Sequence, residues 1–291
     1  LMTVCNNCPR KCNVDRKNAV GFCGMPENVV VAKAGLFQWE EPCVSIGAGS
    51  GAVFFTGCNL KCVFCQNWEI SSNHVGKEIN VNQLAKIFEN LVNLGAQNIN
   101  LVSPSHYYKQ INEALKIYRP NVPIIYNSNG YDSVESIVAL KDYVDVYLVD
   151  VKYFDSNLSA RLSNAPDYFD VASKALEQMV KNQPKIVMQN GAIKKGVIVR
   201  HLVLPNHTDD SVKVLEYLSK YREQIIVSLM SQYTPVFKAS EHADINRKLK
   251  PIEYKFVVGK ARELGFKNGY IQDFTSSDCK FIPDWDFEGV E

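Results

Sequence analysis

The sequence lacks the long apolar segments that membrane insertion requires. No apolar run approaches the roughly 18 residues of a spanning helix, and residues 1–17 are polar and cysteine-rich where a secretory signal would be apolar. An excess of one charge is also absent, since 32 Lys and Arg face 31 Asp and Glu, which gives a net charge of +1 at pH 7. A balanced chain has no general attraction to nucleic acid or anionic lipid. We therefore expect a cytoplasmic protein with no nucleic-acid or membrane partner.

Several common catalytic motifs are missing as well. The sequence contains no HExxH, no lysine-bearing phosphate loop and no recognisable serine elbow. It therefore gives no indication of a metalloprotease, a phosphate-loop enzyme or a serine hydrolase. Residues 47–52 match a loose GxGxxA pattern, but they precede an apolar segment instead of following a strand and opening a helix. We interpret them as a turn that enters the first strand.

Cysteine, by contrast, is abundant and unevenly placed. The chain has 9 cysteines among 291 residues, an odd number in a chain too large to need disulfide staples. All but one precede residue 66, and most of these form two close groups: Cys5, Cys8, Cys12 and Cys23, and then Cys58, Cys62 and Cys65. We interpret Cys43 and Cys279 as single buried thiols. The two groups predict that the front of the chain binds metal.

From residue 52 onward, short apolar runs alternate with amphipathic stretches, which is typical of repeated βα units and a parallel sheet. The expected strands are residues 53–56, 99–103, 124–127, 144–151, 197–204 and 225–230. The expected helices are residues 82–94, 107–118, 133–140, 168–181, 209–221 and 251–264.

Six such units are too few for a closed eight-fold barrel, although an open doubly wound sheet is also compatible with the pattern. We predict an α/β fold, a partial (β/α)6 TIM-like barrel with an N-terminal cysteine-rich metal-binding lobe. The lobe spans residues 1–46, the barrel residues 47–270, and a tail of residues 271–291 packs on the barrel. The functional face is expected at the carboxyl ends of the strands.

The second cysteine group has the spacing CxxxCxxC and directly follows the first expected strand. Three thiolates on one loop can hold three irons of a 4Fe-4S cluster and leave the fourth iron free to chelate a ligand. A zinc site, or part of a four-cysteine cluster, is the alternative, but zinc loops usually pair CxxC with a distant second pair. The spacing therefore favours Cys58, Cys62 and Cys65 as ligands of an open cluster.

With the aromatic Phe64 before Cys65, this loop resembles the CxxxCxΦC signature of the radical S-adenosylmethionine (SAM) superfamily, Φ being an aromatic residue. Residues 40–43, 54–57 and 65–67 more closely resemble pyruvate formate-lyase activating enzyme-like proteins, relatives of the activases of glycyl radical enzymes. The resemblance implies a 4Fe-4S cluster and S-adenosyl-L-methionine, which is cleaved to a 5′-deoxyadenosyl radical. It also implies a flavodoxin- or ferredoxin-type electron donor.

The resemblance further implies a set of cofactor-binding residues: Phe64, Ser105, His106, Asn127, Asn129, Asp150 and Lys152. Position on the fifth expected strand and after the sixth adds His201 and Gln232. Where relatives carry Gly-Gly-Glu to hold the methionine amine, this chain has residues 103–106, Ser-Pro-Ser-His, so Ser105 and His106 stand in for that element. His106 is equally compatible with a packed loop histidine. Asp150 and Lys152 share one face of a strand and are either ligand-binding or a structural ion pair. Arg200 and Tyr233 are weaker candidates.

The first cysteine group has the spacing C-x2-C-x3-C-x10-C. Four soft ligands complete a tetrahedral zinc site or a second, fully ligated iron–sulfur cluster. The sequence leaves both possibilities open for Cys5, Cys8, Cys12 and Cys23.

Three functions follow from these motifs. The leading hypothesis is a radical SAM oxidoreductase that abstracts hydrogen from a glycine of a partner glycyl radical enzyme, as the resemblance implies. The alternatives are a radical SAM catalyst acting on a small molecule, peptide or RNA, and a non-enzymatic iron–sulfur module for electron transfer or sensing.

Overall fold

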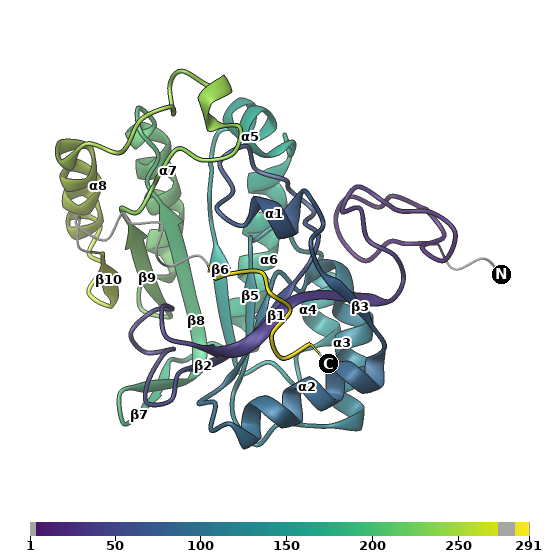
Figure 1. Ribbon diagram of the computed structural model, residues 1–291. Helices are drawn as coiled ribbons and strands as arrows, with labels where there is room; N and C mark the ends of the chain where they lie inside the picture. The colour runs from purple at the N-terminus through teal and green to yellow at the C-terminus, as the bar shows by residue number, and fades with distance from the viewer. Residues whose placement is uncertain (1–3, 273–282, 291) are drawn as a thin grey trace.

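The computed structural model describes residues 4–272 and 283–290, and Cys279 lies outside them. Its centre is one 10-stranded sheet with the order β10-β9-β8-β6-β5-β4-β2-β1-β3 and with β7 (Val187–Gln189) paired to β8. The sheet path ends at β10 and β3 in the described part of the chain, so the barrel is partial and does not close (Figure 1). The predicted fold class is confirmed.

All neighbouring strands from β2 to β10 along this path are parallel. They are β2 (Ser50–Phe55), β4 (Ile99–Val102), β5 (Ile124–Ser128), β6 (Val146–Asp150), β8 (Ala192–Leu202), β9 (Ile225–Met230) and β10 (Gly269–Ile271). The first six coincide with the expected strands. The seventh escaped prediction because three residues are too few to show a pattern.

The connecting helices form a layer on the outer face of the curved sheet (Figure 1). They are α2 (Val81–Asn93), α3 (Tyr108–Ile117), α4 (Val134–Ala139), α6 (Tyr168–Asn182), α7 (Thr208–Leu218) and α8 (Pro251–Glu263). All six were expected. Helix α2 shows how local sequence sets a boundary: Asn80 and Gln83 form a reciprocal capping box at its start.

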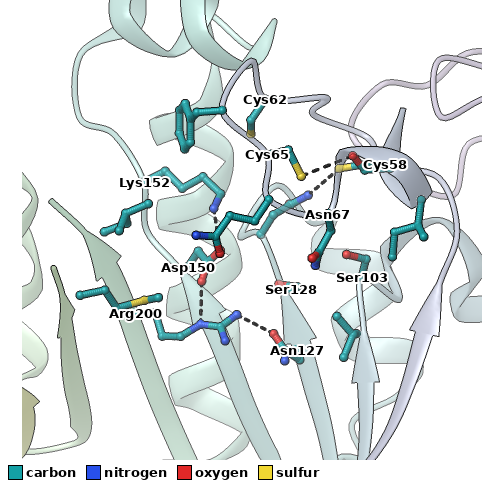
Figure 2. A pocket seen from close by; sticks show the side chains of 18 of the residues that line it. Cys58, Cys62, Cys65, Asn67, Ser103, Asn127, Ser128, Asp150, Lys152 and Arg200 are labelled. Carbon is teal, nitrogen blue, oxygen red and sulfur yellow. Dashed lines mark hydrogen bonds and ion pairs between the residues drawn. The ribbon is translucent and has the colours of Figure 1, made fainter. Parts of the chain in front are cut away.

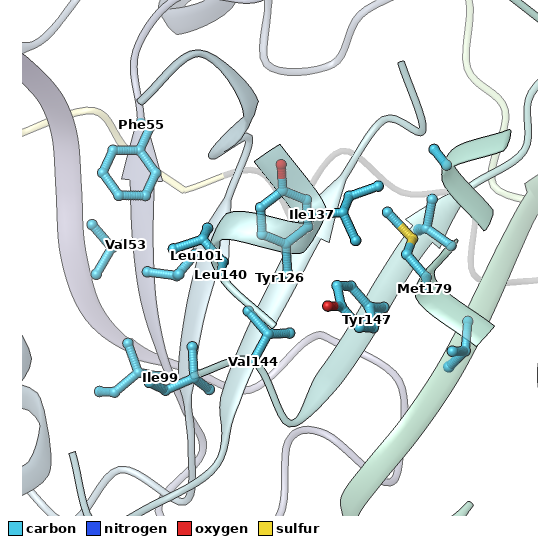
Figure 3. Packing of buried hydrophobic residues seen from close by; sticks show 14 of the residues in the cluster. Val53, Phe55, Ile99, Leu101, Tyr126, Ile137, Leu140, Val144, Tyr147 and Met179 are labelled. Carbon is cyan, nitrogen blue, oxygen red and sulfur yellow. The ribbon is translucent and has the colours of Figure 1, made fainter. Parts of the chain in front are cut away.

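The main core lies between the helices and the sheet. Alternate strand residues such as Val53, Phe55, Leu101 and Tyr126 point outward into it and meet the apolar helix faces (Figure 3). Because both faces of a parallel sheet are covered, strands such as β2 are buried at every position. This packing fixes the strand ends, and therefore the loops that carry the site.

Two strands extend the sheet beyond the parallel part. Strand β1 (Val29–Phe37) pairs antiparallel with β2, and β3 (Lys77–Ile79) pairs antiparallel with β1. Residues 29–37, expected in the cysteine-rich lobe, thus belong to the sheet, where Val29 to Ala32 are buried. The division of the chain into lobe, barrel and tail otherwise stays a prediction.

Residues 283–290 lie along β1. The Ala34 amide donates to the Glu288 carbonyl at 2.9 Å, and Lys33 pairs with Asp286 at 3.0 Å and with Glu288 at 2.9 Å. The Trp285 ring meets Phe54 edge-on at 5.4 Å. This described part of the tail therefore covers the antiparallel end of the sheet.

Among the described residues, no helix has the length and apolar character that crossing a membrane would require.

Candidate functional site

A cavity opens at the carboxyl ends of the parallel strands, as the fold predicts. Its walls come from the carboxyl ends of β2, β4, β5, β6, β8 and β9 and from the loops that follow most of them. The three thiols of the second cysteine group lie at one end of it, and Asp150, Lys152 and Arg200 lie across from them (Figure 2). Side chains from six different segments thus meet in one place.

The loop after β2 carries Cys58, Cys62 and Cys65. Gly57 begins it with φ +84°, and a side chain there would collide with Met25 and with the Cys23 carbonyl. Two backbone hydrogen bonds hold the loop to its neighbours. The Gly57 amide donates to the Ile70 carbonyl at 2.9 Å, and the Val63 amide donates to the Leu162 carbonyl at 2.9 Å. The loop is therefore held in shape by its neighbours.

Each of these three sulfurs has a hydrogen-bond donor. The Ser163 hydroxyl donates to Cys62 Sγ at 2.9 Å, and the Ser71 hydroxyl donates to Cys65 Sγ at 3.4 Å. Cys58 Sγ accepts from the Leu60 amide at 3.3 Å and from the Asn129 amide group at 3.5 Å. Such donors stabilise negative charge on sulfur, as a thiolate ligand of iron carries.

Burial makes Cys62 and Cys65 poor thiolates on their own. It raises the pKa of Cys62, although nearby Lys152 opposes this, and it raises the pKa of Cys65 to about 12. A bound metal supplies the positive charge that such buried thiolates need. Among the described residues, no three His, Cys, Asp or Glu side chains converge on one point as ligands of a single ion do. Thiolates on separate irons of a cluster need not converge in this way, so the donor set fits a 4Fe-4S cluster.

A chain of buried charges crosses the cavity wall. Lys152 Nζ donates to Asp150 Oδ2 at 2.6 Å, and Arg200 Nε donates to Asp150 Oδ1 at 2.8 Å. Arg200 also pairs with Glu40 at 3.2 Å and donates to Asn127 Oδ1 at 2.7 Å. Positive and negative groups therefore alternate from Lys152 to Glu40.

The protonation states of these groups follow from burial and pairing. Burial raises the pKa of Asp150, but Arg200 and Lys152 outweigh it and lower that pKa to about 2. Burial lowers the pKa of Lys152, but Asp150 and Cys62 more than compensate, so its pKa is raised. For Glu40, burial dominates over the opposing effect of Arg200 and raises the pKa to about 7. At neutral pH the Lys152 ammonium and the Asp150 carboxylate are charged.

The structure brings most of the predicted cofactor-binding residues together. Six of the nine line the cavity: Phe64, Asn127, Asn129, Asp150, Lys152 and Gln232. Gly130, shortly after β5, has φ +81°, and a side chain there would strike the Asp150 carbonyl. Its missing side chain thus allows close approach of β6.

Ser105, His106 and His201 are placed elsewhere. The Ser105 hydroxyl donates to buried Asp132, and His106 is buried with Nε2 at 2.8 Å from the Thr56 carbonyl. Burial lowers the pKa of His106 to about 3. His201 Nδ1 lies 2.7 Å from the Val151 carbonyl. We therefore do not propose these three as contacts of the cofactor.

Ser103 takes the place expected of Ser105. Its φ of +62° turns the chain after β4, so that Ser103 faces the cavity while residues 105–107 form a short 3-10 helix behind it. Reasoning from sequence also missed Gln66, Asn67 and Ser128, which line the cavity, and Glu40. Glu40, Gln66 and Asn67 had a signal, because residues 40–43 and 65–67 carried part of the family resemblance.

The other cysteines are placed as follows. Cys43 is buried among Val44, Ile125 and neighbouring apolar residues, which agrees with the expectation of a small buried thiol. Cys5, Cys8, Cys12 and Cys23 lie on the N-terminal loops (Figure 1).

Comparison with known proteins gives the following similarities. A family model described as the radical SAM superfamily matches residues 52–218. The uncharacterized protein MJ0674 of Methanocaldococcus jannaschii is 36% identical over 273 residues, which cover 90% of this chain and 74% of that protein. The crystal structure of Streptococcus suis SuiB is similar with TM-score 0.51 and 13% identity, covering 75% of this chain but only 47% of SuiB. Methylornithine synthase PylB is similar with TM-score 0.50 and 13% identity, covering 74% of this chain and 60% of that one. The two structural similarities concern the fold.

Proposed function

Because the chain belongs to the radical SAM superfamily, whose members use a 4Fe-4S cluster and S-adenosyl-L-methionine, we propose that it cleaves this cofactor reductively and abstracts hydrogen from a glycine of a partner protein. The observation that carries the radical chemistry is the loop of three thiols, which faces a buried array of charges across one cavity. The choice of a protein glycine is supported by the likeness of residues 40–43, 54–57 and 65–67 to activase-like proteins.

Cys58, Cys62 and Cys65 would hold the cluster. When bound, the cluster supplies an electron and S-adenosyl-L-methionine supplies the hydrogen-abstracting group. The sulfur-directed donors Ser163, Ser71 and Asn129 stabilise charge on the ligands. These roles use soft ligands on one loop and leave the opposite wall free for the cofactor.

The opposite wall offers groups that suit an amino acid and a nucleoside. The Lys152 ammonium can bind a carboxylate, and Asn127, Asn129 and Ser103 can form hydrogen bonds with hydroxyl or amine groups. These residues all line the cavity. A flavodoxin- or ferredoxin-type protein is the proposed source of the electron.

Buried apolar side chains form part of the cavity wall and leave less room there for water. The Phe64 ring meets the Tyr233 ring edge-on at 5.7 Å, and Leu202 lies beside them in the lining. Excluding water strengthens electrostatic interactions inside the site and protects reactive species from side reactions.

The test is product analysis after anaerobic reconstitution with iron and sulfide, reduction with dithionite and addition of S-adenosyl-L-methionine. We expect 5′-deoxyadenosine and methionine from the wild-type protein and neither from Cys58→Ala, Cys62→Ala or Cys65→Ala. Cys43→Ala is the matched control and should retain cleavage, because Cys43 is buried in a separate apolar cluster. Cleavage by all three loop variants would refute the assignment of the cluster ligands.

The substrate is tested separately by electron paramagnetic resonance. Incubation with a candidate glycyl radical enzyme should give a glycine-centred radical signal that depends on S-adenosyl-L-methionine. Cleavage without such a signal, accompanied by hydrogen loss from a small molecule, peptide or RNA, would replace the glycine by that substrate. A protein that binds cluster and cofactor yet never cleaves would favour the electron-transfer or sensing alternative.

A further inference from the structure

The N-terminal loops of residues 4–28 contain no helix or strand, and they contribute only Cys23 and Met25 to the main apolar core. A segment of this length cannot hold a defined shape through apolar burial alone and usually needs a disulfide or a metal. Its cysteines are all free thiols. The shape of these loops therefore calls for another source of stability.

The four thiols on these loops are neighbours of one another. Cys8 and Cys23 are buried, with 7% and 6% of their surface exposed. The Lys11 amide donates to the Cys8 carbonyl at 3.1 Å and the Asn13 amide to the Cys5 carbonyl at 3.1 Å. The Phe22 amide, directly before Cys23, donates to Cys12 Sγ at 3.3 Å. Residues separated by as many as 18 positions thus bring soft ligands into one small region.

A backbone amide points at the sulfur of Cys12. The Phe22 amide donates to Cys12 Sγ at 3.3 Å. Lys11, just before Cys12, has a positive φ of 42°. An N–H group directed at sulfur stabilises the negative charge of a thiolate that binds metal.

Arg10 connects these loops with the loop of the proposed cluster. It lies two residues after Cys8, and its side chain donates to the Asn59 carbonyl at 2.7 Å and to the Asn164 carbonyl at 2.6 Å. It also reaches the Ser163 carbonyl at 3.4 Å. Asn59 follows Cys58, and the Ser163 hydroxyl donates to Cys62. One side chain thus braces the surroundings of two cluster ligands.

We propose that Cys5, Cys8, Cys12 and Cys23 form a second, four-thiolate metal centre, and that this centre fixes Arg10 as a positioning residue for the loop of Cys58, Cys62 and Cys65. The ligand chemistry suits zinc or a fully ligated iron–sulfur cluster. The described residues hold no three His, Cys, Asp or Glu side chains placed as ligands of one ion, so metal binding would have to draw the four thiols together.

The first experiment measures zinc, iron and sulfide per chain in the purified and reconstituted full-length protein. We expect wild-type protein to hold either zinc or further iron beyond the first cluster. Cys8→Ser/Cys23→Ser should lose that metal and Cys43→Ser should keep it. A loss of zinc identifies a zinc site and a loss of iron a second cluster. Unchanged metal in the double variant overturns the proposal.

A second variant keeps the test valid if the first fails to fold. The triple variant Cys58→Ala/Cys62→Ala/Cys65→Ala removes only the proposed cluster ligands. It should still bind zinc or iron, and a metal-free triple variant would equally overturn the proposal. This outcome does not depend on cleavage of S-adenosyl-L-methionine, so it is distinguishable from a failure of the proposed function.

The positioning role is tested with Arg10→Met and Arg10→Lys. We expect a chelator to remove iron from the first cluster about 10-fold faster in Arg10→Met, the lower range for losing a group that orients metal ligands. Arg10→Lys should restore part of the slow iron loss, because its ammonium can still donate to a carbonyl but lacks the several N–H groups of the guanidinium. The N-terminal metal should stay in place in both variants. An unchanged rate of iron loss refutes the connection through Arg10.

Discussion

Replacing Arg200 by Met should destabilise the protein strongly, because Arg200 binds several buried polar groups at once. It holds Asp150 at 2.8 Å, Glu40 at 3.2 Å and Asn127 at 2.7 Å. The side chains of Arg200, Asp150 and Glu40 are 16%, 19% and 9% exposed, so water can replace the lost guanidinium only in part. Asp150 would retain Lys152, but Glu40 would have no cation.

The expected loss is about 3–5 kcal/mol in the free energy of unfolding, the usual cost of breaking a buried ion pair by removing one partner. The matched control is Arg161→Met. Arg161 binds Asp244 at 2.6 Å, but these side chains are 39% and 32% exposed. That pair should contribute only about 0–1 kcal/mol. The contrast isolates burial, since the residue types and the substitution are the same.

The loss should also depend on pH. Burial already raises the pKa of Glu40 to about 7, and removing Arg200 raises it further. A carboxyl whose pKa is raised on folding contributes stability that is present at low pH and is lost as pH rises through the folded value. The Arg200→Met variant should therefore fall further behind the wild type from pH 5 to pH 8. Adding Glu40→Gln should abolish most of this difference.

The measurement is anaerobic urea unfolding followed by circular dichroism, with every variant loaded with iron to the same level. Midpoints are compared with a common slope at pH 5 and pH 8. A loss below about 1 kcal/mol at pH 8, equal to that of the exposed control, would refute the reasoning that buried Arg200 compensates Glu40 and Asp150.

Two further variants test the cavity. Ser163→Ala removes the donor to Cys62 Sγ and should lower the midpoint potential of the cluster by about 40 mV, because the reduced state loses a stabilisation of ~1 kcal/mol. A redox titration measures the potential, with Ser159→Ala on the same helix as the control. An unchanged potential in Ser163→Ala would contradict the role of Ser163 as a donor to the cluster ligand. Lys152→Met should raise the dissociation constant for S-adenosyl-L-methionine about 10- to 100-fold through loss of a charged hydrogen bond while iron content stays the same. Equilibrium dialysis checks this, and unchanged affinity would make Lys152 a purely structural partner of Asp150.

The parts of the fold that local sequence controls could be predicted. The strand that became β2, the helix that became α2 and the loop of Cys58, Cys62 and Cys65 each depend on residues near one another in the chain. The alternation of an expected strand likewise indicated that Asp150 and Lys152 lie together. The strand β6 ends at Asp150, and the two side chains pair at 2.6 Å. Each of these features shows in the sequence as the period of a strand or helix or as the spacing of a ligand set, so the sequence alone was sufficient to predict it.

Contacts between distant segments required the tertiary structure. Glu40 meets Arg200 across 160 positions, and Arg10 meets Asn164 across 154. The left-handed turn at Ser103 decides that this residue, and not Ser105, faces the cavity. The sequence by itself determined the kind of ligand, the succession of strands and helices, and the edge of the sheet where the site lies. Only the curvature and packing of the whole sheet decided which charges compensate one another, because these depend on how segments far apart in the chain are brought together.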